Sequence, residues 1–164
     1  MLNEIKGDIF NWVKDGGIIC HQTNYFGVMG AGIAAAIRHK LLTNAQYAKY
    51  VELCRMGGRT LLGHVQYLEC DGGITVANCF CQDDGRADAN RPNADYTITC
   101  YYEMKRCLID IRSKAKLEGK RVYIPYKMGC GIAGGDWGGT VHYIIKDVFG
   151  KSPIDDVIVR RPGD

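Results

Sequence analysis

The chain has 164 residues, of which 46% are apolar and 24% are charged, and its formal net charge is +3. This length and composition indicate a globular domain with enough core to fold alone. The charge is weak and the Lys and Arg residues are dispersed, which argues against a polyanion-binding surface and so against nucleic acid as a direct partner.

The sequence also indicates the cellular compartment and the state of the cysteines. The first residues, MLNEIKGD, lack the apolar stretch of a signal peptide. No segment approaches the roughly 18 consecutive apolar residues of a membrane helix, so we expect a cytoplasmic protein that does not bind membranes. The eight cysteines include no C-x-x-C pair, and we expect free thiols, with Cys20, Cys79 and Cys107 in the core. We expect no metal and no cofactor.

The hydrophobic pattern predicts alternating strands and helices. Apolar or alternating segments predict strands at residues 1–6, 18–20, 61–70, 74–80, 121–126 and 156–160. Apolar positions three and four residues apart predict helices at residues 30–41, 44–56, 95–118 and 137–149. We expect Asn44 to cap the second helix, and Asp71-Gly72-Gly73 to turn a hairpin. With one hairpin among alternating elements, we predict an α/β fold, a mixed sheet covered by helices on both faces.

A small-residue loop follows the strand at residues 18–20. The polar turn His21–Asn24 leads into Gly27–Gly32, and a helix begins directly afterwards. This layout presents backbone N–H groups and the positive end of a helix dipole to an anion. The glycine spacing matches neither the dinucleotide fingerprint nor the P-loop. Close packing of the helix on the sheet would also require these small residues, so this loop alone leaves both interpretations open.

A second glycine loop, Gly129–Gly135, also follows a strand and precedes a helix. Both loops therefore lie at carboxyl ends of strands, where open α/β sheets bind ligands. Together they could wrap a pyrophosphate with neutral backbone donors, which agrees with the weak net charge. The pair favours a phosphorylated ligand held between the loops.

Several stretches carry a resemblance to a known family. They are Ile5–Ile9, Asn24 with Gly27, Met29–Ala34, Ile124-Pro125 with Gly129–Gly131, and Gly134–Trp137. In this order they resemble macro domains, the modules that bind and process ADP-ribose. The sequence of residues 129–137 is most similar to the branch with terminal ADP-ribose-protein glycohydrolases, yeast ADP-ribose 1″-phosphate phosphatase and bacterial DNA-ADP-ribose antitoxins. The resemblance implies one three-layer α/β/α macro domain spanning residues 1–164, with a central mixed sheet.

The resemblance also implies roles for individual residues. Asp8 would accept a hydrogen bond from the adenine amino group, the Ile9 backbone N–H would help to read the ring, and Asn24 would bind the distal ribose. Asp8 could instead be a turn carboxylate, and Asn24 an Asx-turn residue that closes the strand. The diphosphate and distal ribose would be held by Gly30, Ala31, Gly32, Ile33, Gly129, Cys130, Gly131, Ile132, Ala133 and Gly134.

The catalytic part of the resemblance is weaker. The glycohydrolase relatives have a nucleophilic lysine just after the strand equivalent to residues 74–80, and here residues 78–84, NCFCQDD, contain none. The human glycohydrolase has an aspartate where this chain has Ala133. Lysine-adduct chemistry is therefore not expected.

The remaining catalytic candidates are Asn24, His21 and Asp136. An unperturbed histidine titrates near a pKa of about 6.5, so His21 could act as a general acid or base, or it could be a structural strand-end residue. Asp136 precedes a helix and could instead be its N-cap.

The sequence therefore predicts an ADP-ribose-binding macro domain that hydrolyses an ADP-ribose derivative, either ADP-ribose 1″-phosphate or an ADP-ribosyl conjugate. The alternative is a non-catalytic reader of ADP-ribose. The expected partners are ADP-ribose, ADP-ribose 1″-phosphate or an ADP-ribosylated macromolecule, with nucleic acid only as such a substrate, and the protein is expected to be a monomer. Gln82 and Arg86, in the polar loop 82–94, could close over the ligand. The tail Arg160-Arg161-Pro162 could stack on adenine, or either segment could simply be solvated.

Overall fold

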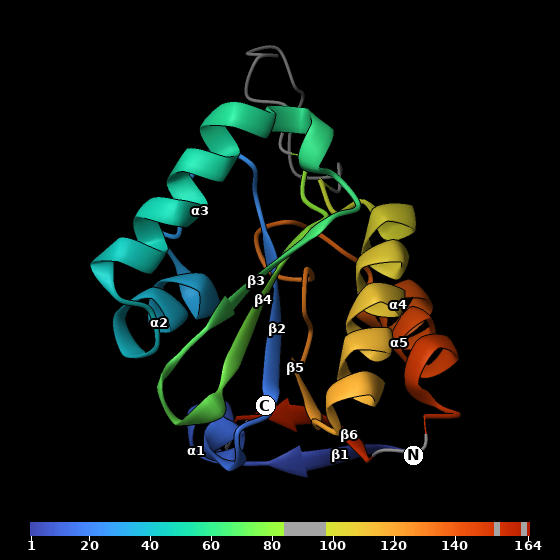
Figure 1. Ribbon diagram of the computed structural model, residues 1–164. Coiled ribbons are helices and arrows are strands. Elements are labelled where there is room, and N and C mark those ends of the chain that lie inside the picture. The colour runs from blue at the N-terminus through green and yellow to red at the C-terminus, as the bar shows by residue number, and fades with distance from the viewer. Residues whose placement is uncertain (84–97, 153–154, 162–163) are drawn as a thin grey trace.

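A six-stranded sheet forms the centre of the computed structural model, which describes residues 1–83, 98–152, 155–161 and 164 (Figure 1). The strand order is β1-β6-β5-β2-β4-β3, and all neighbours are parallel except β3 and β4. The strands are β1 (Leu2–Lys6), β2 (Ile18–Thr23), β3 (Val65–Glu69), β4 (Thr75–Phe80), β5 (Val122–Pro125) and β6 (Asp156–Arg160). The predicted mixed sheet, its edge strand at the N-terminus and its one hairpin are confirmed.

Helices cover both faces of the sheet, so the three-layer α/β/α architecture is confirmed (Figure 1). Within β2, Ile18 and Cys20 face α4 and α5, whereas Ile19 faces α1 and α2, as the two-residue period of a strand requires. Met29, Tyr50 and Phe80 form a smaller cluster beneath α3. The helices are α1 (Ile9–Trp12), α2 (Gly32–Lys40), α3 (Asn44–Gly57), α4 (Tyr101–Glu118) and α5 (His142–Phe149).

Some predicted boundaries are wrong. The cap of α3 is Thr43, not Asn44, because Thr43 and Gln46 form a reciprocal capping box with hydrogen bonds of 3.0 and 3.1 Å. Most of the polar loop 82–94, including Arg86, lies outside the described residues.

The cysteine prediction is confirmed. All eight are free thiols, and Cys20, Cys79 and Cys107 are buried in the core beneath α4. Among the helices that the structure describes, none has the length and apolar character needed to cross a membrane.

The turn predicted at His21–Asn24 is also wrong, because β2 continues to Thr23. His21 is opposite Asn78 in the parallel ladder, and its Nε2 lies 2.6 Å from Asn78 Oδ1. The amide of Asn78 donates to Gln66 Oε1, so Oδ1 is the acceptor and His21 Nε2 carries the proton. Burial lowers the pKa of His21 to about 4, and its Nδ1 is buried without a partner in the described part of the chain.

We expect His21 to make stability depend on pH on the acid side. An unfolded histidine has a pKa of about 6.5, so between pH 6.5 and 4 the unfolded chain binds a proton that the native chain excludes. The free energy of unfolding should therefore fall by up to about 1.4 kcal/mol per pH unit as the pH is lowered through this window. Urea unfolding at a series of pH values measures the slope. His21→Gln should flatten it, whereas His39→Gln, at an exposed position, should not; equal slopes in the wild type and His21→Gln would contradict this account.

Candidate functional site

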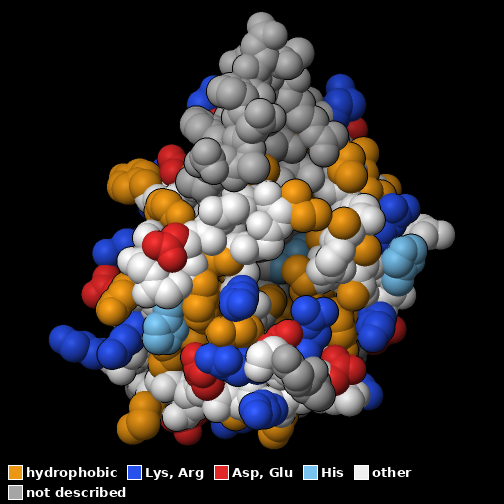
Figure 2. All heavy atoms as spheres, turned by 180° about the vertical axis from the view of Figure 1, so that it is seen from behind, with side chains coloured by type: hydrophobic (Ala, Val, Ile, Leu, Met, Phe, Trp, Pro, Cys, Tyr) orange, Lys and Arg blue, Asp and Glu red, His pale blue; other side chains and the backbone are white. Residues whose placement is uncertain are grey.

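The two glycine loops, the start of α1 and the end of β6 line one cleft of about 1170 Å³. Figure 2 shows one face of the molecule, with a hollow near its middle and Lys and Arg side chains below the hollow. Typical sites for small molecules enclose roughly 300–1,000 Å³, so this cleft can take an extended ligand. Its lining comes from the carboxyl ends of the parallel strands β2, β4, β5 and β6, as expected for an open α/β sheet.

Asn24 shapes the first glycine loop and also lines the cleft. Its Oδ1 accepts the Phe26 N–H at 3.0 Å, and its Nδ2 donates to the Val28 carbonyl at 3.0 Å. The hydroxyl of Tyr50 donates to the Asn24 carbonyl at 2.9 Å, while Met29 is buried beneath the loop. Asn24 is thus an Asx-turn residue at the cleft wall.

The first loop ends in a helix N-terminus that no side chain caps. Ala31 is the N-cap of the nine-residue helix α2 and offers no side-chain acceptor. The first N–H groups of a helix have no intrahelical partner, and Gly32, Ile33 and Ala34 all line the cleft. Their free donors and the helix dipole make this wall attractive to an anion.

The second loop is held tightly against the sheet at Gly129. Its carbonyl accepts hydrogen bonds from Thr99 Oγ1 at 2.7 Å and from the Gly135 N–H at 2.9 Å. Gly129 has φ +72°, and a Cβ there would lie 2.8 Å from Gln22 Oε1. Farther along the loop, the N–H groups of Gly131 and Ile132 have no acceptor among the described residues.

A network of neutral side chains connects this loop to β2 and β4. Gln22 Nε2 donates to Thr99 Oγ1 at 3.1 Å and to Gln82 Oε1 at 3.3 Å, while Cys81 Sγ donates to Gln22 Oε1 at 3.3 Å. Gln22 and Gln82 both line the cleft. Gln22 was not predicted as a site residue because the sequence pattern assigned it to a turn. A strand extended by two residues would have placed it on the same face as Cys20.

A carboxylate and apolar side chains lie at the other end of the cleft. Asp8 caps α1 by accepting the Phe10 N–H on Oδ1 at 2.9 Å, and its exposed side chain lines the cleft. Ile9 is the first residue of α1, so its N–H has no intrahelical acceptor. Ile33 and Val159 line this region as well.

The structure brings most of the predicted ligand-binding residues together in the lining of one cleft. The cleft is lined by Asp8, Ile9, Asn24, Gly30, Ala31, Gly32, Ile33, Gln82, Gly129, Cys130, Gly131, Ile132 and Ala133. Gly134 is not part of that wall; its N–H donates to the Gly131 carbonyl at 2.9 Å and closes the loop. Burial raises the pKa of Cys130 to about 11, so its thiol is neutral at pH 7.

Two of the catalytic candidates lie outside the cleft wall. His21 is fully buried on the opposite face of β2 from Gln22. Asp136 is an N-cap whose Oδ1 accepts the Gly139 N–H at 3.0 Å. Asn24 is the remaining candidate that lines the cleft.

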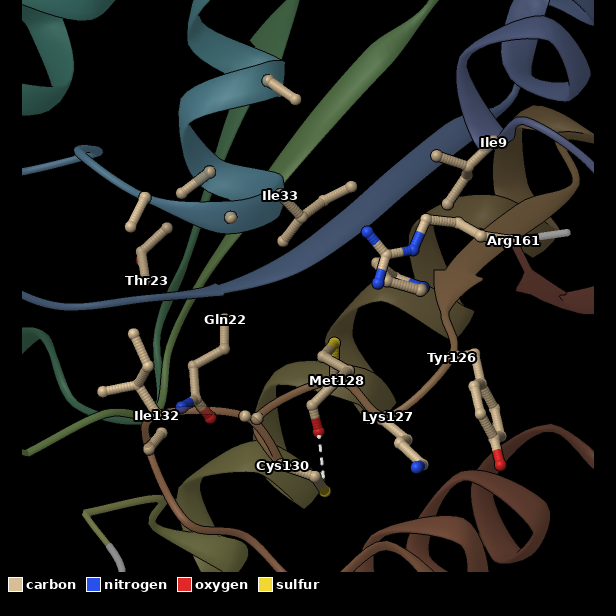
Figure 3. A pocket seen from close by; sticks show the side chains of 18 of the residues that line it. Ile9, Gln22, Thr23, Ile33, Tyr126, Lys127, Met128, Cys130, Ile132 and Arg161 are labelled. Carbon is tan, nitrogen blue, oxygen red and sulfur yellow. Dashed lines mark hydrogen bonds between the residues drawn. The ribbon is translucent and has the colours of Figure 1, made fainter. Parts of the chain in front are cut away.

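Charged side chains also line the cleft, and of these only Arg161 was considered as a site residue from the sequence. Lys40 at the end of α2, Lys127 after β5, and Arg161 and Asp164 after β6 all line the cleft. Figure 3 shows Lys127 and Arg161 among them. Their separation in the sequence leaves no local signal for such a group. Among the described residues, no cluster of three or more His, Cys, Asp or Glu side chains could hold a metal ion.

We expect Gly129→Ala to destabilise the protein through the second loop. The substitution forces a positive φ on an L side chain, a strain of order 1–3 kcal/mol, and requires the Gln22 amide to shift from its position 2.8 Å away. For a chain of this size about 1 kcal/mol lowers Tm by roughly 2–4 °C. Differential scanning calorimetry should show a fall of several degrees for this variant. Gly131→Ala is the matched control, since no heavy atom lies within 4 Å of its Cβ position; equal Tm values for the two variants would disprove the constraint.

Comparisons with known proteins are consistent with this architecture. No model of a protein family matches the sequence, and no curated protein sequence does so at a significant level. Among solved structures, a protein of unknown function from Bacteroides thetaiotaomicron superposes with a TM-score of 0.81 at 24% identity, covering 99% of this chain and 98% of that one. The macrodomain of Mycobacterium tuberculosis DarG superposes with a TM-score of 0.76 at 21% identity, covering 100% and 99%.

A third structure contains a ligand. Thermosipho africanus DarTG in complex with ADP-ribose superposes with a TM-score of 0.69 at 17% identity, covering 98% of this chain and 42% of that one. These likenesses extend over the whole sheet and both helical layers rather than over one motif. The chain therefore has the macrodomain fold.

Proposed function

We propose that the protein binds ADP-ribose in this cleft, with the diphosphate between the two glycine loops. The observation that carries the proposal is the convergence of free backbone donors: the uncapped start of α2 on one side, and Gly131 and Ile132 on the other. Such donors bind a diphosphate without needing a cluster of cations. The ADP-ribose complex of Thermosipho africanus DarTG, which has the same fold, supports this assignment.

The adenine would lie at the end of the cleft formed by α1 and β6. Asp8 uses one carboxylate oxygen to cap α1, which leaves its other oxygen to accept the exocyclic amino group of the base. The Ile9 N–H is a donor for a ring nitrogen, and Ile33 and Val159 offer apolar surface to the ring. This arrangement distinguishes adenine, which donates from its amino group, from a base with a carbonyl at that position.

The distal ribose would lie at the opposite end, among amide side chains. Asn24, Gln22 and Gln82 line the cleft there. Amides both donate and accept, which suits the hydroxyl groups of a sugar. They do not titrate near neutral pH, so they can orient a water molecule or a hydroxyl group but cannot exchange a proton with it.

A second candidate function is hydrolysis of ADP-ribose 1″-phosphate or of an ADP-ribosyl conjugate. Asn24 lines the same cleft as the free donors of both loops, which favours this function, because such donors can stabilise charge that develops near the distal ribose. The water would be positioned by Asn24, with neither His21 nor Asp136 taking part. A non-catalytic reader uses the same cleft without this step.

Asp8→Asn should separate base recognition from helix capping. The amide can still accept the Phe10 N–H, so α1 keeps its cap, but the charged acceptor for the adenine amino group is lost. A hydrogen bond to a charged group is worth about 1.5–3 kcal/mol, so isothermal titration calorimetry should show at least a tenfold weaker affinity for ADP-ribose with an unchanged Tm. Asp71→Asn, an exposed carboxylate outside the cleft lining, is the control. Absence of ADP-ribose binding by the wild type would refute the proposal.

The hydrolase candidate is tested with the same preparation. Protein shown to bind ADP-ribose is incubated with ADP-ribose 1″-phosphate and with ADP-ribosylated protein and DNA, and the released phosphate and ADP-ribose are measured. We expect turnover that Asn24→Ala abolishes, while Asn44→Ala, at an exposed position on α3, leaves it unchanged. Binding without turnover of any of these substrates would exclude hydrolysis of them and leave the reader function.

A further inference from the structure

We propose that the cleft has a subsite for a phosphate ester on the proximal ribose of its ligand, with the Lys127 ammonium group as the cation of that subsite. The preferred ligand is then an ADP-ribose that carries a further phosphate on its 2′ or 3′ oxygen. This inference rests on the proposed function, because it adds one group to the ADP-ribose that the cleft is proposed to bind.

The order of the strands places Lys127 beside the middle of the ligand. In the proposed orientation the adenine lies at the end of β6 and the distal ribose at the ends of β2 and β4. Strand β5 lies between β6 and β2, and Lys127 follows β5 and lines the cleft. In Figure 3 it lies between Tyr126 and Cys130. The proximal ribose joins the adenine to the diphosphate, so this sugar crosses the sheet beside Lys127.

The backbone of Lys127 has an unusual conformation. Its φ is +60°, and every other positive φ among the described residues belongs to a glycine. The Met128 N–H donates to the Pro125 carbonyl at 3.0 Å, which closes a turn with Lys127 as its third residue. Glycine is favoured where that residue needs a positive φ. A lysine at such a position is strained, and strained residues concentrate at ligand sites.

The ammonium group of Lys127 forms no ion pair within the described part of the chain. Its Nζ lies 5.4 Å from the centre of the Tyr126 ring, and the residue is exposed. Asp164 lines the same cleft, but its carboxylate is bonded to Arg161, from which it accepts the backbone N–H at 3.0 Å and the Nε–H at 3.4 Å. Lys127 is therefore a cation in the cleft wall whose charge is left for a ligand.

Lys40 adds a second cation toward the base end of the cleft. It is the last residue of α2, and its Nζ lies 4.7 Å from the centre of the ring of Phe10 in α1. Both residues line the cleft. Like Lys127, Lys40 has no ion pair among the residues that the structure describes. Two unpaired cations raise the local concentration of an anionic ligand group.

This charge matches a phosphate better than the free hydroxyl groups of the proximal ribose. Dinucleotide-binding sites bind a free 2′-hydroxyl with a carboxylate and a 2′-phosphate with a cationic side chain. A phosphate ester carries about two negative charges at neutral pH, which a lysine ammonium binds as a point charge. The diphosphate has the backbone donors of both glycine loops in the proposed orientation, so it does not require Lys127.

The experiment compares the affinities for ADP-ribose, 2′-phospho-ADP-ribose and 3′-phospho-ADP-ribose by isothermal titration calorimetry. The wild type should bind at least one phosphorylated form about tenfold more tightly than ADP-ribose, as one charge-assisted hydrogen bond supports. The preference should shrink between about 50 mM and 300 mM NaCl, because salt screens an exposed charge.

Three variants assign the preference to Lys127. Lys127→Gln should abolish it and leave the affinity for ADP-ribose within about twofold, because the diphosphate contacts are unchanged. Lys127→Arg should retain it, and so should Lys116→Gln, which removes an exposed lysine of α4 outside the cleft lining. Glutamine has the same Cβ at the same φ as lysine, so the Tm of Lys127→Gln should equal that of the wild type.

Three results would overturn the inference. Wild-type affinity for both phosphorylated forms that is no higher than for ADP-ribose would exclude the subsite. A preference that persists in Lys127→Gln would exclude Lys127 from it, and an equal loss for all three ligands would assign Lys127 to the diphosphate. Wild-type protein that binds none of the three ligands would refute the proposed function itself, which is distinct from the other outcomes because in those the wild type binds ADP-ribose.

Discussion

The closure of the second glycine loop onto the end of β2 is the constraint on which the cleft depends. The Gly129 carbonyl accepts hydrogen bonds from Thr99 and from Gly135, and Gly129 has a positive φ, with its Cβ position 2.8 Å from Gln22 Oε1. Because Gln22 also bonds Gln82, the ends of β2, β4 and β5 form one rigid unit. The free donors of the loop are thereby fixed opposite the start of α2, at a separation that the fold sets and the ligand need not induce.

Some polar side chains of the molecule stabilise the fold and others line the cleft, and this distribution favours ligand binding over catalysis. Its buried histidine, His21, bonds Asn78 inside the sheet through Nε2, and Asp136 caps a helical turn. Both residue types are common catalysts, but here their side chains serve the fold. The end of the cleft opposite Asp8 is left with amides, which orient a ligand without exchanging protons. Hydrolysis at this site would depend on positioned water and backbone donors.

Local patterns could predict the fold and much of the cleft, because strand and helix periods and the two glycine loops are local features. What they could not predict depends on contacts between distant segments. His21 appeared to belong to a polar turn because its partner Asn78 lies 57 residues away. Gln22 was missed because the strand was predicted to end at Cys20, and its partners Gln82 and Thr99 lie 60 and 77 residues away. Lys40, Lys127 and Asp164 line one cleft although they come from distant parts of the sequence. Short-range sequence patterns predict helices and strands. Buried polar pairs and clusters of charged side chains can be identified only from the tertiary structure.

The most direct test of the account is a crystal structure of the protein with ADP-ribose. The account predicts diphosphate oxygens within about 2.7–3.2 Å of N–H groups at the start of α2 and at Gly131 or Ile132. It further predicts the adenine amino group at Asp8 and the distal ribose beside Asn24. A ligand bound outside this cleft, or one bound in it with its diphosphate away from both glycine loops, would contradict the central claim that the loops form a single clamp.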